Sequence, residues 1–265
     1  LMLLKNKNII LTGASGILGK ELSQGLLNEG ANLALIDVDK TSLLKLKKQL
    51  NYSNKQKVIF YNINIIEEKS VIETISDINK RLGTIDVLHN NAASKGSSLE
   101  KFLTPYEDYQ LTTWDEVMSG NLTSMFLMSR EVIKFMKKQK SGSIIQTASI
   151  YGVVSPKKEI YEGSSYNGFE IQSPAIYSVS KSAVIGLTKY LASYLGEHNI
   201  RVNSISPGGI FSGQNSTFVD KYSKKVPLGR MTSVKDVLGA VVFLCSDQSL
   251  YITGQNIIID GGFSL

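Results

Sequence analysis

Short apolar runs alternate with longer stretches of mixed polarity from one end of the chain to the other. An apolar run bounded by turn residues predicts a buried strand, whereas apolar residues that recur every three to four positions predict a helix with one buried face. Regular alternation of the two predicts an α/β fold with a parallel, doubly wound sheet and helices on both of its faces. We expect seven strands, near residues 8–11, 32–36, 57–62, 85–88, 143–147, 201–205 and 256–259, and helices near residues 17–29, 40–50, 67–82, 113–138, 175–198 and 234–246.

The chain has 265 residues, an ordinary length for one α/β domain, and no repeat or low-complexity linker divides it. We therefore predict a single domain over residues 1–265, in which one sheet carries both the nucleotide-binding and the catalytic groups.

A glycine-rich turn, residues 12–19, follows the first predicted strand and precedes the first predicted helix. In that setting Gly13 permits a tight turn, Gly16 lets the backbone approach a pyrophosphate, and Gly19 lets the helix pack closely. The N-terminus of the helix faces the phosphates. The order of strand, turn and helix therefore predicts a Rossmann-type dinucleotide site. The residues that we assign to it are Gly13, Ser15, Gly16, Ile17 and Gly19.

The second predicted strand ends in an acidic residue, Asp37. A carboxylate there would accept hydrogen bonds from the hydroxyls of the adenosine ribose and repel a 2′-phosphate. We therefore predict NAD as the cofactor in preference to NADP. Asp39 is a second candidate for this role, and Lys40 partly offsets the repulsion.

Tyr177 and Lys181 lie four residues apart in a segment that predicts a helix, so the two side chains share one helical face. A nearby ammonium favours the phenolate and lowers the pKa of a tyrosine from its ordinary value of about 10. A tyrosine tuned in this way passes a proton near neutral pH. The spacing alone is weak evidence, because a core aromatic beside a solvated lysine gives the same pattern.

Further motifs follow one another in a fixed order and resemble the short-chain dehydrogenase/reductase family over essentially the whole chain. They are the glycine turn, Asn90-Asn91-Ala92-Ala93 after a strand, Asn121 in Gly-Asn-Leu-Thr, Ser149 after a strand, the Tyr177/Lys181 pair, Pro207-Gly208-Gly209-Ile210, and a closing segment from Thr253 to Gly262.

The resemblance implies an oxidoreductase that acts on CH–OH groups with a nicotinamide cofactor. Tyr177 would be the general acid/base, Ser149 would polarise the substrate oxygen, and Lys181 would tune Tyr177 and bind the nicotinamide ribose. Asn121 would hold a water that links the lysine to solvent. The structural alternatives are an ordinary helix-start serine and a locally satisfied asparagine. The resemblance also implies cofactor contacts from Asn64, Asn90, Ala92, Pro207, Gly208, Ile210 and Ser212.

Two positions depart from the family pattern. Ile17 stands where single-domain members usually carry a glycine, and this spacing is more typical of sugar-nucleotide epimerases and dehydratases. Those enzymes normally need a separate C-terminal substrate domain, for which the chain after Lys181 is short. Asn64 stands where an aspartate often meets the adenine amino group, and its amide oxygen can still accept that bond. An epimerase or dehydratase and a non-catalytic NAD-binding or assembly protein therefore stay as alternatives.

The segment of residues 152–174 is longer than the family norm, and its polar, glycine- and proline-containing composition predicts a loop. We expect it to form a substrate lid, with a solvent loop or an oligomer contact as equal alternatives. A second substrate loop is expected at residues 211–230. The candidate substrate contacts are Ser149, Tyr151, Tyr161, Tyr177 and Gly209.

A narrower resemblance links three segments to oxidoreductases known as flagellin modification protein A, of bacterial glycan and nonulosonate pathways. The segments are Ser149 to Val154, Ile160 to Gly163, and Ser206 to Phe211. This resemblance implies a sugar or an activated sugar as the small-molecule substrate.

The formal net charge is +6, with lysines clustered at residues 45–57 and 134–140. We interpret these clusters as solvated helix faces and therefore expect no nucleic-acid partner. No apolar run is long enough to span a bilayer, and the N-terminal one is too brief for a signal peptide, so we expect no membrane association and a cytoplasmic location.

The chain has a single cysteine, Cys245, and two histidines, His89 and His198, which suit structural positions. We therefore expect no metal site and no disulfide within the chain. By resemblance to the family we expect a homodimer or homotetramer, formed through the long helices at residues 114–138 and 177–198.

Overall fold

A seven-stranded sheet forms the centre of the molecule, and all of its neighbouring strands run parallel. The computed structural model describes residues 2–166 and 168–265; residues 1 and 167, the latter inside the predicted loop 152–174, lie outside the described residues. The strand order is β3-β2-β1-β4-β5-β8-β9, which confirms the predicted fold class. The strands are β1 (Asn8–Thr12), β2 (Asn32–Asp37), β3 (Val58–Asn62), β4 (Val87–Asn90), β5 (Gly142–Thr147), β8 (Ile200–Pro207) and β9 (Asn256–Ile259).

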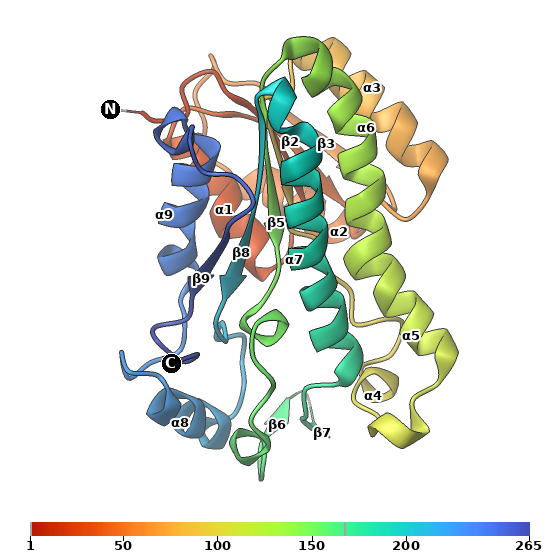
Figure 1. Cartoon of the computed structure of the whole chain (residues 1–265), viewed down its shortest axis with the longest axis vertical. Coiled ribbons are helices and arrows are strands. Elements are labelled where there is room, and N and C mark those ends of the chain that lie inside the picture. The colour runs from red at the N-terminus through yellow and green to blue at the C-terminus, as the bar shows by residue number, and fades with distance from the viewer. Residues whose placement is uncertain (1, 167) are drawn as a thin grey trace.

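Helices cover both faces of this sheet (Figure 1). Successive residues of a strand point to opposite faces. Ile9 and Leu11 of β1 therefore pack with the helices of one face, while Ile10 packs with those of the other. The first face carries α1 (Ile17–Asn28), α2 (Lys40–Gln49) and α9 (Val234–Cys245), and the second carries α3 (Glu68–Leu82), α6 (Ser124–Gln139) and α7 (Ala175–Leu195).

The sequence predicts one helix over residues 113–138, and the structure corrects this prediction. α5 (Leu111–Met118) and α6 are joined by a π-helical turn, η2 (Ser119–Thr123). Turns of this kind occur frequently at functional sites. This one carries the buried Asn121.

The segments predicted as loops at residues 152–174 and 211–230 are more regular than expected. The first contains η4 (Lys158–Ile160) and an antiparallel hairpin of β6 (Ser165–Tyr166) and β7 (Phe169–Glu170), and the second contains α8 (Ser216–Lys225). Both lie beyond the carboxyl ends of the strands, at the bottom of Figure 1. The two segments pack together in one apolar cluster, whose buried members are Ile150, Ile160, Phe218, Tyr222, Val226, Met231 and Phe263. The remaining short elements are α4 (Leu99–Phe102), η1 (Tyr106–Asp108), η3 (Ile150–Gly152), η5 (Gly196–His198) and η6 (Asp247–Ser249).

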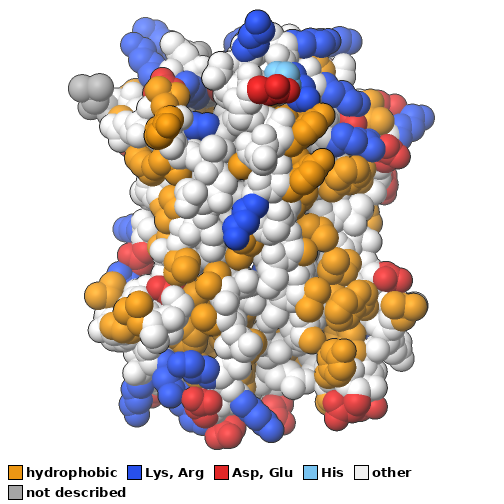
Figure 2. All heavy atoms as spheres, in the orientation of Figure 1, with side chains coloured by type: hydrophobic (Ala, Val, Ile, Leu, Met, Phe, Trp, Pro, Cys, Tyr) orange, Lys and Arg blue, Asp and Glu red, His pale blue; other side chains and the backbone are white. Residues whose placement is uncertain are grey.

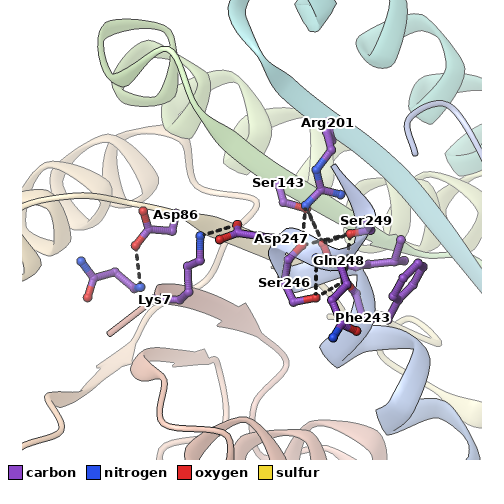
Figure 3. A network of polar contacts seen from close by, with 11 residues as sticks. Lys7, Asp86, Ser143, Arg201, Phe243, Ser246, Asp247, Gln248 and Ser249 are labelled. Atoms are coloured by element: carbon purple, nitrogen blue, oxygen red, sulfur yellow. Dashed lines mark hydrogen bonds and ion pairs between the residues drawn. The ribbon is translucent and has the colours of Figure 1, made fainter. Parts of the chain in front are cut away.

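A polar network holds the end of α9 at the amino ends of β5 and β8 (Figure 3). Arg201 of β8 donates to the carbonyls of Leu244 (2.9 Å) and Ser246 (3.3 Å), and Ser143 of β5 donates to Leu244 at 2.9 Å. The last carbonyls of a helix lack partners within the helix. Side chains of the sheet supply the missing donors and so fix the position of α9.

Candidate functional site

A cleft of about 1150 Å³ lies at the carboxyl ends of the central strands. Strands β1 and β4 are neighbours in the sheet, although β2 and β3 separate them in sequence. In open α/β sheets, ligands bind at such a reversal of strand order. The cleft brings together most of the predicted site residues: Gly13, Ser15, Gly16, Ile17, Asp37, Asn64, Ala92, Ser149, Tyr151, Tyr177, Lys181, Pro207, Gly208, Gly209, Ile210 and Ser212.

The glycine turn has the geometry that its spacing predicts. Gly13 adopts φ +64°, a conformation that favours glycine, and an added Cβ there would lie 2.8 Å from Ala92 Cα. A Cβ on Gly19 would lie 2.1 Å from the carbonyl oxygen of Gly13, so α1 packs directly on the turn. Gly16 is the residue before α1, and Ile17 begins that helix at the cleft. The turn therefore leaves its backbone open toward the cleft.

The carboxylate of Asp37 lies at the end of β2, where it contacts the glycine turn. Its Oδ2 accepts a hydrogen bond from the backbone N–H of Ser15 at 2.8 Å, and its Oδ1 accepts one from Asp39 at 3.0 Å. The carboxylate of Asp39 caps α2 instead, accepting from the backbone N–H of Ser42 at 3.0 Å, and these bonds lower its pKa. Of the two acidic candidates, Asp37 is thus the one joined to the phosphate-binding turn.

Tyr177 and Lys181 lie one turn apart near the start of α7, with the lysine Nζ 5.9 Å from the centroid of the tyrosine ring. The buried Lys181 donates to the carbonyl of Thr147 at 2.9 Å. Burial lowers the pKa of this lysine to about 8, because the charged form loses its hydration.

The structure corrects the predicted direction of the Tyr177 pKa. Burial raises that pKa above its ordinary value, and hydrogen bonding with Ser149 opposes the rise without reversing it. The ammonium of Lys181 is held by the Thr147 carbonyl, so desolvation of the phenol is the larger effect. The phenol therefore keeps its proton at neutral pH.

Ser149 and Asn121 both have local structural roles in addition to their places near the pair. The Ser149 hydroxyl accepts from the backbone N–H of Tyr151 at 3.2 Å, at the start of η3. Asn121 is fully buried behind the cleft, where its Oδ1 accepts from the Ser94 backbone (2.7 Å) and its Nδ2 donates to Ser180 Oγ (3.2 Å). Asn121 thereby joins the cleft wall at Ser94 to the helix that carries Lys181.

Three predicted contacts lie away from the cleft lining: Gly19, which packs on the glycine turn, Asn90 and Tyr161. The buried side chain of Asn90 donates to Ser129 and Gln146, both at 3.0 Å, and so joins β4 to α6 and β5. The prediction that Asn90 lines the cofactor groove is therefore wrong. Tyr161 lies behind Tyr151. The cleft is also lined by Asn91, Thr147 and Glu116, none of which was predicted to contact a ligand. The signal for Asn91 was its position one residue past the strand end.

Three observations fit the cleft to a dinucleotide: the turn leaves no room for a Cβ at Gly13 or Gly19, an acidic side chain ends β2, and the volume is large. Within the described residues, no group of three or more His, Cys, Asp or Glu side chains is arranged to hold a metal ion. Among the helices that the structure describes, none is both long and apolar enough to cross a membrane.

Comparisons with known proteins agree with this geometry. The family described as enoyl-(acyl carrier protein) reductase matches residues 13–264. The chain is 33% identical to post-translational flagellin modification protein A of Campylobacter coli, over 99% of this chain and 100% of that protein. It is 32% identical to the 3-oxoacyl-[acyl-carrier-protein] reductase FabG of Thermotoga maritima, over 98% and 99% of the two chains.

Among solved structures, a short-chain dehydrogenase from Leptospira borgpetersenii with bound NAD⁺ superposes with a TM-score of 0.83. It is 34% identical, and the match covers 99% of this chain and 94% of that one. Fold, cleft and relatives agree: the chain belongs to the short-chain dehydrogenase/reductase family, oxidoreductases that act on CH–OH groups.

Proposed function

We propose that the protein transfers a hydride between NAD and a secondary alcohol or ketone of a sugar or activated sugar. One observation carries the proposal: Ser149, Tyr177 and Lys181 line the same cleft as the glycine turn and Asp37. A nucleotide held by the turn would extend toward the three polar side chains, where a substrate oxygen would be bound.

The side chains divide the remaining work between them. When bound, the nicotinamide accepts or supplies the hydride. Tyr177 gives its proton to the substrate oxygen during ketone reduction, and its raised pKa keeps that proton available at neutral pH. Ser149 donates to the same oxygen, and Lys181 stabilises the phenolate that remains. In the reverse reaction, alcohol oxidation, Tyr177 would act as the base, with Ser149 and Lys181 in the same supporting roles.

Asp37 supports NAD in preference to NADP, because a carboxylate at this position repels a 2′-phosphate. The bound NAD⁺ of the Leptospira relative is consistent with this choice. The similarity to flagellin modification protein A supports a sugar substrate, whereas FabG shows that relatives of equal identity act on acyl chains. The hydroxyl groups of Ser149 and Tyr151 in the cleft favour a hydroxylated substrate.

We also propose that residues 152–174 form a lid over the substrate. Gln172 donates to the carbonyl of Leu103 at 2.6 Å, and Lys95 lies 4.6 Å from the ring centroid of Tyr166. These contacts join the insertion to the segment between β4 and α5, which contributes Ser94, Gly96 and Ser97 to the cleft lining. The loop 211–230 packs against the insertion through the apolar residues of α8.

A homodimer or homotetramer fits the outer surface of α6 and α7. Figure 2 shows hydrophobic side chains gathered along these two helices. They include the exposed Phe126, Val179, Tyr190 and Tyr194. An apolar surface of this kind on paired helices suits a second copy of the chain.

Titration with NAD, NADH, NADP and NADPH, followed by a panel of sugars, sugar nucleotides and β-ketoacyl thioesters read at the nicotinamide absorbance, tests the proposal. We expect tight binding of NAD(H) only, and turnover of a sugar. Tyr177→Phe should lower kcat by at least about 100-fold with little change in the Kd for NADH, because only the proton donor is lost. Tyr52→Phe, at an exposed site, is the control. Near-normal turnover by Tyr177→Phe would refute the assigned mechanism.

A further inference from the structure

Two phenols meet at the edge of the cleft, and the catalytic roles above use neither of them. The hydroxyl of Tyr161 donates to the hydroxyl of Tyr151 at an oxygen–oxygen distance of 2.6 Å. Tyr151 belongs to η3, directly after Ser149, and lines the cleft. Tyr161 belongs to the insertion and lies behind Tyr151. The pair is therefore a direct link between the insertion and the catalytic wall.

Packing holds both rings in place. The ring of Tyr161 lies 5.7 Å from that of Phe218 on α8, and the ring of Tyr151 meets Phe263 edge-on at 6.4 Å. Both tyrosines contact the apolar core shared by the insertion and α8. Phenylalanine would satisfy this packing equally well, whereas a buried hydroxyl costs free energy unless it is hydrogen-bonded. The two hydroxyl groups therefore call for an explanation beyond packing.

The direction of the hydrogen bond supplies that explanation. A phenol has one proton to donate and two lone pairs to accept. When Tyr161 donates, the proton of Tyr151 is free for an acceptor in the cleft. Burial raises the pKa of Tyr151 far above its ordinary value and that of Tyr161 to about 12, so both groups keep their protons at neutral pH.

The surroundings of Tyr151 limit what this acceptor is. Ser149 and Tyr177, the two groups assigned to the reacting oxygen, line the same cleft as Tyr151, and the Ser149 hydroxyl accepts from the Tyr151 backbone at 3.2 Å. They are sufficient for that oxygen. The donor of Tyr151 is thus available for a second oxygen of the same substrate.

We propose that Tyr161 is a positioning residue that aims the Tyr151 hydroxyl at a second substrate oxygen, so that the insertion selects ketones with a hydroxyl group beside the carbonyl. This inference rests on the proposed function and names the substrate class more closely: α-hydroxy ketones and the corresponding vicinal diols. In this arrangement Tyr151 binds the substrate, and Tyr161 acts only through Tyr151.

Two substrate pairs test the proposal: acetoin against butan-2-one, and 2-hydroxycyclohexanone against cyclohexanone, each reduced with NADH. The quantity measured is the ratio of kcat/KM within each pair, which cancels effects on the cofactor and on Tyr177. We expect Tyr151→Phe to lower the preference for the hydroxylated ketone by about tenfold, the worth of one hydrogen bond, and Tyr161→Phe by about threefold. The double variant should match Tyr151→Phe alone, because Tyr161 acts through Tyr151.

Tyr109→Phe is the matched control, because Tyr109 is a half-buried residue whose hydroxyl oxygen is buried and has no partner among the described residues. It should leave the ratio unchanged. A ratio that is also unchanged in Tyr161→Phe, or losses that add in the double variant, would overturn the positioning role while the proposed function stands. Absence of NADH oxidation with all four ketones, by an enzyme that also fails on the sugar panel, would overturn both proposals.

Discussion

The buried ammonium of Lys181 should make the fold less stable at neutral pH than at high pH. Its pKa falls from the ordinary 10.5 to about 8 on folding, so the unfolded chain binds the proton more tightly than the native protein does. At about 1.4 kcal/mol for each pH unit, this difference corresponds to roughly 3 kcal/mol of lost stability at pH 7. The loss shrinks as the pH rises from 8 toward 10.5, because the native lysine becomes neutral first.

Lys181→Met keeps the length of the side chain and removes its charge. The variant also loses the hydrogen bond to Thr147, which leaves a carbonyl without its donor at a cost of about 1–3 kcal/mol. At pH 7 the two effects oppose each other, and the variant should be as stable as the wild type or more stable. The free energy of unfolding of the variant minus that of the wild type should fall by roughly 2 kcal/mol between pH 7 and pH 9.5. The contribution of the hydrogen bond does not change this fall.

Urea denaturation of both proteins at a single protein concentration, at pH 7, 8, 9 and 9.5, measures this difference. Other titrating groups are common to the two proteins and cancel. Two stability curves that run parallel over the whole range, within about 0.5 kcal/mol, would refute the reasoning that burial of the lysine charge opposes folding. Turnover should be lost in the variant at every pH.

Two further predictions concern stability away from the catalytic pair. Gly19→Ala should lower the free energy of unfolding by about 1–3 kcal/mol and weaken NADH binding, because its Cβ would meet the backbone of the glycine turn. The control is Gly239→Ala, which has open space around it and should be neutral or slightly stabilising. Fluorescence titration and denaturation of both variants check this, and equal behaviour would contradict it. Arg201→Met should cost about 1–3 kcal/mol in denaturation without changing KM, because the Leu244 and Ser246 carbonyls each lose a charged donor, although Ser143 and Ser249 still donate to them. Arg81→Met, at an exposed ion pair, should cost under about 1 kcal/mol, and a larger loss there than at Arg201 would argue against the network.

Much of the fold could be predicted because buried parallel strands are continuous apolar runs. β1 is buried at every position, and its bounds, Asn8–Thr12, differ from the predicted strand, residues 8–11, only at the last residue. The helix α8 was missed, although Asn215 caps it and Phe218 and Tyr222 recur at helical spacing on its buried face. Its polar residues and the loop composition around it hid that pattern.

The site was predictable where a motif fixes the backbone and less so where packing decides. The glycine turn lies where the spacing places it, since Gly13 and Gly19 have no room for a side chain. Asn91 lines the cleft where Asn90 was predicted to do so, because Asn90 is the last paired residue of β4 and its side chain binds the buried Ser129 and Gln146. The pKa of Tyr177 depends on desolvation by residues distant in sequence, and the spacing of residues along one helix does not predict that burial.

The π-helical turn η2 changes the phase of a helical rod halfway along its length. An α-helix advances about 100° per residue, and a π turn accommodates one residue more than an α turn does. Val117 on α5 and Met125 and Met128 on α6 recur at the spacing of one helical face, yet the turn sends them into different apolar clusters. The two halves of the rod serve different neighbours: α5 packs beside the start of α7, and α6 packs on the sheet. The buried positions keep a spacing of three to four residues across the turn, so the periodicity of residues 111–139 predicts one continuous helix and does not reveal the break.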